Sequence, residues 1–227
     1  MTVLDLHIHS NYSLDTLAKP EKILHAAKRK GLDGVAITDH NTIKGGLEIE
    51  RIARELGMIG IAGVEVYTDS GDIIGLFVNE EIESRDSLSV IDFIHSQGGI
   101  AILPHPFRKH DLNDELLKRI DLIEVFNARS DALQNEKALE LAKKLGKPGI
   151  SGSDAHFYSE VGACSVSTST SNIMKCLLSG DFTLKTSYIP PHRESFSQMI
   201  RMFKEHTPLG AFPYAGQAML RMITRKY

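Results

Sequence analysis

The chain of 227 residues contains no tryptophan and only two cysteines, Cys164 and Cys176. Two cysteines in a chain long enough to bury a core argue against a disulfide framework, and we expect reduced thiols that pack as small hydrophobic groups. No stretch reaches the roughly 18 apolar residues of a membrane span. The first residues also lack the basic region and apolar run of a signal peptide. These absences predict a cytoplasmic protein with no membrane partner.

An excess of positive charge is missing as well. The formal net charge is −3, and the 24% charged and 42% hydrophobic residues are ordinary values for a globular protein. Such a composition provides no basic surface for gripping a long polyanion. We therefore expect a small substrate and no stable nucleic-acid complex. The length suits one large core better than two small ones.

What the chain does contain is ten histidines and a regular alternation of β-type runs with amphipathic segments. About seven strands fit before residue 160, beginning with "TVLDLHIH" and "DGVAITDH". Between these two runs, "KPEKILHAAKRKG" has the pattern of a helix, with a proline in its first turn and a glycine as its stop. This alternation predicts a largely parallel α/β sheet, either open or closed into a barrel.

The character of the sequence changes towards its C-terminal end. Residues 160–187 have the pattern strand, helix, strand and complete a domain that we place at residues 1–188. From residue 189 onwards the chain has a Met-rich amphipathic segment and a tail rich in glycine, proline and methionine. In this C-terminal extension, residues 189–227, the helical spacing of Met199, Met202 and Phe203 favours a docking surface over a cofactor site. We expect any homo-oligomer contact to use this segment.

Metal-capable side chains follow six of the predicted strands. Because strand side chains alternate between faces, His7 and His9 share the face opposite to that of Leu4, Leu6 and Ile8. The groups at the other five strand ends are Asp39 with His40, Glu65, His105, Asn127, and Asp154 with His156. Parallel α/β sheets carry their functional groups at the carboxyl ends of the strands, so these side chains should lie close together.

Each of these groups has an ordinary explanation when it is taken singly. A His-x-His pair is more often partly exposed than metal-bound, "PHP" can be a rigid turn, and Asp154 with His156 can cap a helix. Their joint placement favours a metal site. Imidazole and carboxylate donors without thiolate suit Zn, Mn, Fe or Ni. Because the donors exceed the needs of one ion, we predict two or three ions that share a bridging carboxylate.

The other histidines do not join this set so readily. Four of them, in predicted helices or in the extension, are expected to be solvated or structural: His25, His95, His192 and His206. His110 is ambiguous, because it lies five residues past His105 in a polar loop. Asp5 shares the face of His7, so it either orients a ligand histidine or forms a buried ion pair at the barrel floor.

In chain order, the segments "HIHS", "TDHN", "GVEV", "LPHPF", "EVFNAR" and "GSDAH" resemble the motifs of the PHP (polymerase and histidinol phosphatase) family of metal-dependent phosphoesterases. That family also includes histidinol phosphatases and a module of bacterial replicative polymerases. The resemblance covers residues 3–187 and implies a distorted (β/α)7 barrel, here followed by a short C-terminal appendage. It also implies a cluster of two or three divalent metal ions, which would be Zn, Mn or Fe.

The resemblance further implies which residues bind each ion. The ligands of the first ion would be His7, His9 and Asp154. Those of the second would be His105 and Asn127, with Glu65 as the bridge between the two ions. Those of the third would be Asp15, His40 and His156.

Two positions depart from the family pattern. Asn127 stands where some relatives have histidine, and its amide oxygen is a weaker and harder donor, so the second ion should exchange more readily or be Mn or Fe rather than Zn. Asp72 stands where many relatives have a histidine, which leaves substrate orientation at that corner open. In addition, the 39 residues between Glu65 and His105 leave no room for the helical insertion that some nucleotide-cleaving relatives carry.

The expected chemistry is phosphate ester hydrolysis. Two ions about 3.5 to 4 Å apart can present a bridging hydroxide in line with phosphorus and neutralise the phosphoryl oxygens. Arg108 and Arg129 follow strand ends and suit bidentate contact with phosphate, although a surface ion pair is the alternative for each. His40 or His156 could protonate the leaving alcohol. We therefore predict a metal-dependent phosphatase that acts on a small-molecule or nucleotide phosphate monoester.

Two other functions stay open from the sequence. The first is a phosphodiesterase or exonuclease acting on oligonucleotide ends, against which the net charge and the missing insertion argue. The second is a non-catalytic binding module that keeps the metal site only for stability, against which the intact ligand set argues. Amide hydrolysis is accessible to the same ions, but the arginines favour phosphate.

Overall fold

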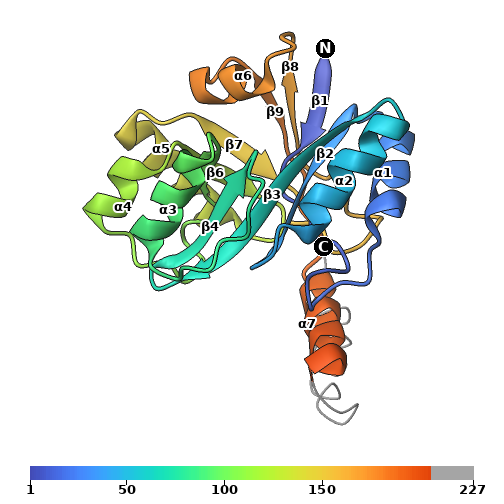
Figure 1. Cartoon of the computed structure of the whole chain (residues 1–227). Helices are drawn as coiled ribbons and strands as arrows, with labels where there is room; N and C mark the ends of the chain where they lie inside the picture. Colours follow the sequence, from blue (N-terminus) through green and yellow to red (C-terminus); the bar gives the residue numbers. More distant parts are fainter. Residues whose placement is uncertain (206–227) are drawn as a thin grey trace.

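The computed structural model describes residues 1–205, which form a nine-stranded sheet with helices on its outer side (Figure 1). The strands are β1 (Thr2–Asp5), β2 (Gly34–His40), β3 (Ile59–Thr68), β4 (Gly71–Leu76), β5 (Ile100–Leu103), β6 (Leu122–Asn127), β7 (Gly149–Gly152), β8 (Ser165–Thr168) and β9 (Thr183–Lys185). The helices are α1 (Pro20–Arg29), α2 (Lys44–Glu55), α3 (Ser87–Ser96), α4 (Asp114–Arg119), α5 (Ala132–Leu145), α6 (Ile173–Ser179) and α7 (His192–Glu205).

The sheet curls until its two ends almost meet. Its strand order is β7-β6-β5-β4-β3-β2-β1-β8-β9. The Ser151 hydroxyl on β7 donates to the carbonyl oxygen of Ser165 on β8 at 3.2 Å. Just beyond β1 and β7, Ile8 and Ala155 form an isolated parallel bridge. The distorted α/β barrel predicted from the sequence is therefore confirmed.

The direction of the strands is mixed. β1, β2 and β3 are parallel to one another, as are β5, β6 and β7, whereas β4 runs antiparallel to both of its neighbours. Only Asp69 and Ser70 separate β3 from β4. A connection this short permits a hairpin but no crossover helix, so β4 is reversed in a way that the alternation pattern did not predict. β8 is the second reversed strand, because it runs antiparallel to β1 and β9. The seven strands before residue 160 are confirmed.

Three layers of apolar side chains hold the barrel together. One cluster packs α1 and α2 against the sheet, and a second packs α3, α4 and α5. A third takes residues from strands β1 to β8 and fills the inside of the curve, where Leu4 and Leu6 lie. Ile8 instead belongs to the cluster around α1, so the predicted alternation of faces ends soon after β1.

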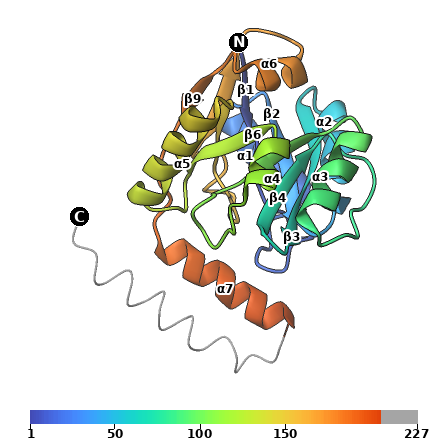
Figure 2. The same cartoon turned by 90° about the vertical axis from the view of Figure 1, so that its left-hand side faces the viewer.

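The two ends of the barrel are covered by different helices. Figure 1 shows α6 near the end where β1 begins and α7 at the opposite end, and Figure 2 shows α7 lying across that end. Cys164 and Cys176 are free thiols and are buried, as the sequence predicted. None of the helices described here is long and apolar enough to cross a membrane.

Candidate metal centre

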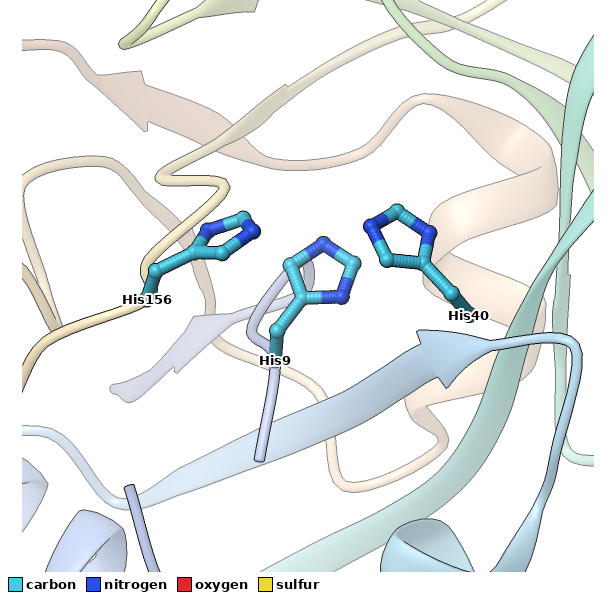
Figure 3. A group of neighbouring side chains, drawn as sticks. All are labelled: His9, His40 and His156. Carbon is cyan, nitrogen blue, oxygen red and sulfur yellow. The ribbon is translucent and has the colours of Figure 1, made fainter. Parts of the chain in front are cut away.

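All nine residues predicted as metal ligands lie at the end of the barrel that α7 covers. Seven of them end or follow a strand, Glu65 lies within β3, and Asp15 reaches in from the loop between β1 and α1. His40 is the most exposed side chain of the histidine and carboxylate ligands, at 17%. The rings of His9, His40 and His156 group together although they come from three separate segments of the chain (Figure 3).

The first group of side chains converges within the distances that one ion requires. The Nε2 atoms of His7 and His9 are 3.2 Å apart. His9 Nε2 lies 3.3 Å from Asp154 Oδ1 and 3.4 Å from Glu65 Oε2. Tetrahedral zinc with bonds of 2.0 to 2.1 Å places its ligand atoms about 3.3 Å apart. These four side chains can therefore hold a single ion with little movement.

Glu65 stands between this group and two other histidines. Its Oε1 is 2.9 Å from His105 Nε2, whereas its Oε2 is 3.0 Å from His40 Nδ1. Each carboxylate oxygen thus faces a different set of imidazole nitrogens. This is the position that a carboxylate needs in order to bridge two ions.

A further group is built around Asp15. Its Oδ2 lies 3.0 Å from His156 Nε2 and 3.2 Å from His40 Nε2. The remaining oxygen, Asp15 Oδ1, is buried without a hydrogen-bond partner. The structure thus brings together the three side chains that were predicted to hold the third ion.

Several buried ligand atoms of the centre lack a hydrogen-bond partner within residues 1–205, and a divalent cation would provide one. Besides Asp15 Oδ1, the Nδ1 atom of His105 is buried without a hydrogen bond, and His40 Nδ1 has only the carboxylate of Glu65 close by, at 3.0 Å. Unsatisfied buried polar groups are costly. A bound cation would supply the missing partner, so the residues present are suited to divalent ions.

The protonation states of Glu65 and His9 suit metal binding. His7 and His40 must each lose a proton first, because burial is outweighed by the carboxylates beside them, which raise the pKa of both rings above the usual range. Burial would raise the pKa of Glu65, but His7 and His40 hold it well below its usual range. Burial, followed by the neighbouring charges of His40 and His156, lowers the pKa of His9 to about 3. Metal ligands must be charged carboxylates and neutral imidazoles. Glu65 and His9 are therefore in the form that binds an ion.

Two ligands are turned towards the centre by unusual backbone conformations. His105 and Asp154 have φ angles of 29° and 50°, in the left-handed region that residues other than glycine rarely adopt. Such conformations are typical of functional sites, where the surrounding structure maintains them at a cost. Both residues lie two positions past the end of a strand, at the turn where the chain leaves the barrel.

Glu124 belongs to the centre and was not identified from the sequence. It is 1% exposed. Its Oε1 lies 2.9 Å from His7 Nδ1, and its Oε2 accepts hydrogen bonds from the backbone N–H of His105 and from Asn127 Nδ2, each at 2.9 Å. A carboxylate on Nδ1 leaves the Nε2 of His7 free to bind metal. Glu124 therefore orients His7 and also anchors two neighbouring strand ends.

A β-bulge explains why strict alternation conceals Glu124. Glu124 and Asn127 are three residues apart, so a regular strand would place them on opposite faces. The register of β6 against β7 shifts between Glu124 and Phe126, and this extra residue returns both side chains to the same side. The sequence "EVFN" contains both polar residues but no signal for the bulge.

The amide of Asn127 points its nitrogen, not its oxygen, at the carboxylates. Nδ2 donates to Glu124 and lies 3.3 Å from Asp154 Oδ2, while Oδ1 accepts the backbone N–H of Arg129 at 2.9 Å. To bind an ion through oxygen, the amide must turn over and set its NH2 group against that N–H. The role of Asn127 as a ligand stays a prediction. Asp72 Oδ2 approaches the same corner, 4.0 Å from His105 Nε2.

The two predicted phosphate-binding arginines both have carboxylate partners. Arg108 Nη1 donates to Asp154 Oδ2 at 2.9 Å, and its side chain is 29% exposed. Arg129 Nη2 donates to Glu160 Oε2 at 2.8 Å, and both side chains are almost fully buried. Arg129 thus forms an ion pair, which was the alternative to phosphate binding, but this pair is buried and not at the surface. Arg108 remains accessible and lies beside a predicted ligand.

Asp39 and Asp5 brace the backbone around the centre. Asp39 accepts hydrogen bonds from Ser10 and Ser13, which fixes the start of the loop that carries Asp15. Asp5 accepts the backbone N–H groups of Ser153 and Gly162. Asp5 contacts the ligand His7 only through the backbone of His7, so the carboxylate does not orient a ligand ring, and no ion pair with a cationic side chain is seen within residues 1–205.

Of the remaining histidines within residues 1–205, three lie outside the centre, whereas His110 packs edge-on against the ring of His105 and could share an ion with His105 and Asp72. His25 is half exposed, His95 pairs with Asp121 at 2.8 Å, and His192 contacts the ring of Phe196 edge-on. His110 has both ring nitrogens about 3 Å from backbone carbonyl oxygens. His206 lies outside the described residues.

A cavity of about 1080 Å³ opens over the centre. Three cationic side chains with no place in the metal ligand set line it besides Arg129, namely Arg108, Lys109 and Arg201. Tyr67 stacks on His40 with ring centroids 4.7 Å apart and forms part of the wall. The sequence analysis identified neither Tyr67 nor Arg201. Arg201 comes from α7, far along the chain, and no local pattern signals its approach to the site.

Comparison with known proteins finds two family models and several relatives that match the chain. A family model described as the PHP domain matches residues 5–154, and a second described as PHP-associated matches residues 132–179. An uncharacterized protein of Methanocaldococcus jannaschii is 42% identical over 150 residues, which cover 60% of this chain and 88% of the relative. A second uncharacterized protein of that organism is 37% identical over 184 residues, covering 76% and 73%.

Three solved structures share the fold at low sequence identity. PsfC from Pseudomonas syringae has a TM-score of 0.62 at 19% identity and covers 89% of this chain and 98% of its own. A candidate metal-dependent phosphoesterase from Bifidobacterium adolescentis has a TM-score of 0.57 at 18% identity, with coverages of 68% and 88%. An amidohydrolase from Chromobacterium violaceum, solved with sulfate, has a TM-score of 0.55 at 18% identity, with coverages of 67% and 87%.

Proposed function

Because the chain belongs to the PHP domain family and a solved structure with the same fold is described as a candidate metal-dependent phosphoesterase, we propose that it hydrolyses phosphate monoesters of a small molecule or nucleotide. The observation that supports this proposal is the position of Arg108. Its guanidinium contacts Asp154, a predicted ligand, and also lines the cavity. A cation held beside the ions is suited to a phosphoryl group, which carries more negative charge than an amide substrate.

The cavity supports a small anionic substrate. Its volume of about 1080 Å³ is at the upper end of the range for small-molecule sites and exceeds the needs of inorganic phosphate. Arg108 and Lys109 lie in its wall together with Arg201 from α7. This arrangement can hold a phosphate over the ions and a leaving group of nucleotide size beneath α7.

The ligand set would hold the ions at two positions around Glu65 and at a third beside Asp15. When bound, divalent ions supply Lewis-acid activation of the phosphoryl group and lower the pKa of a water molecule. The chain contributes orientation. Glu124 fixes the ring of His7, and Arg108 restrains Asp154. Arg108 would also take up charge on the phosphoryl oxygens.

A histidine at the cavity wall would donate a proton to the leaving alcohol. His40 and His156 both line the cavity, and Asp15 lies within 3.2 Å of each ring. His40 is held between the rings of His9 and Tyr67, so its orientation is fixed. Either imidazole could donate a proton from a ring nitrogen that the ions leave free.

Phosphate release from a panel of substrates tests the proposal. Protein stripped with a chelator and reloaded with Mn, Fe or Zn should release phosphate from sugar and nucleotide monoesters, and His9→Ala should abolish this activity. His25→Ala, at a half-exposed position on α1, is the matched control and should retain it. Release of mononucleotides from a short oligonucleotide in place of phosphate would establish an exonuclease. A loaded protein that is inert towards both substrate classes would contradict the proposal.

A further inference from the structure

The described part of the C-terminal extension is fastened across the mouth of the barrel. At its start, the backbone N–H of Ile189 donates to Ala128 O at 2.9 Å, and the guanidinium of Arg193 lies over the ring of Phe157, 5.3 Å from its centroid. Ser197 accepts a hydrogen bond from Arg129 at 3.3 Å. These contacts attach the first half of α7 to the loops that follow β6 and β7.

The same helix presents one polar face to the cavity. The side chains concerned are Glu194, Ser197, Gln198 and Arg201. They are spaced i, i+3, i+4 and i+7, which is one face of an α-helix. α7 is therefore a wall of the cavity.

The far end of α7 contacts the loop that carries Asp15. The Lys204 ammonium donates to three carbonyl oxygens of that loop: Thr16 at 2.7 Å, Ser13 at 2.8 Å and Asn11 at 3.1 Å. Within residues 1–205, none of these three oxygens accepts a hydrogen bond from another donor. One ammonium, with its three N–H groups, thus satisfies the carbonyls on both sides of Asp15.

We propose that Lys204 is a positioning residue for the third metal ion, because it fixes the loop that presents Asp15 to His40 and His156. The loop is held by other contacts as well, because Ser13 binds Asp39, Thr16 binds the carbonyl oxygen of His156, and the loop closes on itself through a backbone hydrogen bond between residues 11 and 18. Lys204 adds a side chain that ties three carbonyl oxygens of the loop together, and without it Asp15 Oδ2 should move from its position 3.0 to 3.2 Å from the two imidazoles. The extension is then part of the metal site, although it contributes no ligand.

Electrostatics alone would give the opposite result. Lys204 is a cation close enough to Asp15 and Asp39 for these carboxylates to act on its charge. Removing that charge should therefore attract cations to the centre more strongly. If Lys204 acts by positioning, its loss must instead weaken the third site. The sign of the change separates the two effects.

Calorimetric titration of the chelator-stripped protein with Mn²⁺ tests the inference. The inference about Lys204 rests on the proposed metal centre but not on phosphatase activity. A protein without that activity that still binds ions would therefore still test it. We expect Lys204→Met to weaken one binding step by about 10- to 100-fold, the usual effect of losing a group that orients a ligand. The steps assigned to the other ions should be unchanged.

Two further variants complete the test. Lys204→Arg keeps the charge and the donors and should restore the affinity, while Lys175→Met on the exposed face of α6 should change nothing. Hydrogen exchange should show faster exchange of residues 11–18 in Lys204→Met, with the barrel strands unaffected. A Lys204→Met variant that binds every ion as the parent does, or more tightly, would overturn the inference.

Discussion

Replacing Glu124 with glutamine should impair the metal centre while leaving its size and shape intact. The carboxylate faces three donors: one at Oε1, from His7, and two at Oε2, from the backbone of His105 and from Asn127. A glutamine has only one oxygen to accept hydrogen bonds. If that oxygen serves the two donors at Oε2, the new NH2 group must face His7 Nδ1.

This arrangement changes the tautomer of His7. To accept from the NH2 group, Nδ1 must lose its hydrogen, and the proton moves to Nε2, the atom that lies among Glu65, His9 and Asp154. An Nε2 that carries hydrogen cannot bind an ion. The expected loss is about 10- to 100-fold in metal affinity, or about 1.4 to 2.7 kcal/mol.

Calorimetric Mn²⁺ titration of Glu124→Gln measures this loss, with circular dichroism to confirm that the variant is folded. Glu140→Gln on the exposed face of α5 is the matched control and should bind as the parent protein does. If Glu124→Gln keeps the parent affinity for every ion, Glu124 does not set the tautomer of His7, and the reasoning is wrong.

Other predictions follow from packing and burial. A Cβ at Gly152 would lie 1.9 Å from Glu124 Oε1, so Gly152→Ala should lower both the melting temperature and the metal affinity. Gly31→Ala is the control, because a Cβ there meets open space. It should lose only about 1 to 2 kcal/mol of stability from its left-handed backbone and bind metal normally. Burial raises the pKa of the Cys164 thiol, so at pH 8 this group stays protonated and should resist iodoacetamide in a Cys176→Ala variant until the protein is unfolded. Modification of the native protein at the rate of an exposed thiol would contradict that burial.

Periodicity was sufficient to predict the largely parallel α/β sheet and the clustering of eight ligands at one end of it, whereas the closed barrel and Asp15 followed from the resemblance to the PHP family. Strands and helices alternate, and polar groups at the carboxyl ends of strands are brought to one end of the barrel by topology alone. The placement of His40 beside His156, 116 positions later in the chain, needed no knowledge of side-chain packing.

What the sequence could not provide depends on local irregularities and on long-range docking. Glu124 faces the centre because of a bulge that "EVFN" does not signal. The pairing of Arg129 with Glu160 depends on where a loop after β7 turns. Likewise, α7 was expected to be an amphipathic segment for docking, but its position over the cavity is set by contacts such as that of Lys204, which no spacing rule reveals. Whether Met199, Met202 and Phe203 make a homo-oligomer contact stays a prediction.

Anomalous diffraction from crystals soaked in Mn²⁺ and phosphate tests the central claim most directly. The account predicts anomalous peaks on both sides of Glu65 and a further peak beside Asp15, with phosphate oxygens contacting these ions and Arg108. Peaks that lie only at surface carboxylates, or a phosphate bound away from the ions, would contradict a metal-dependent phosphatase built on these ligands.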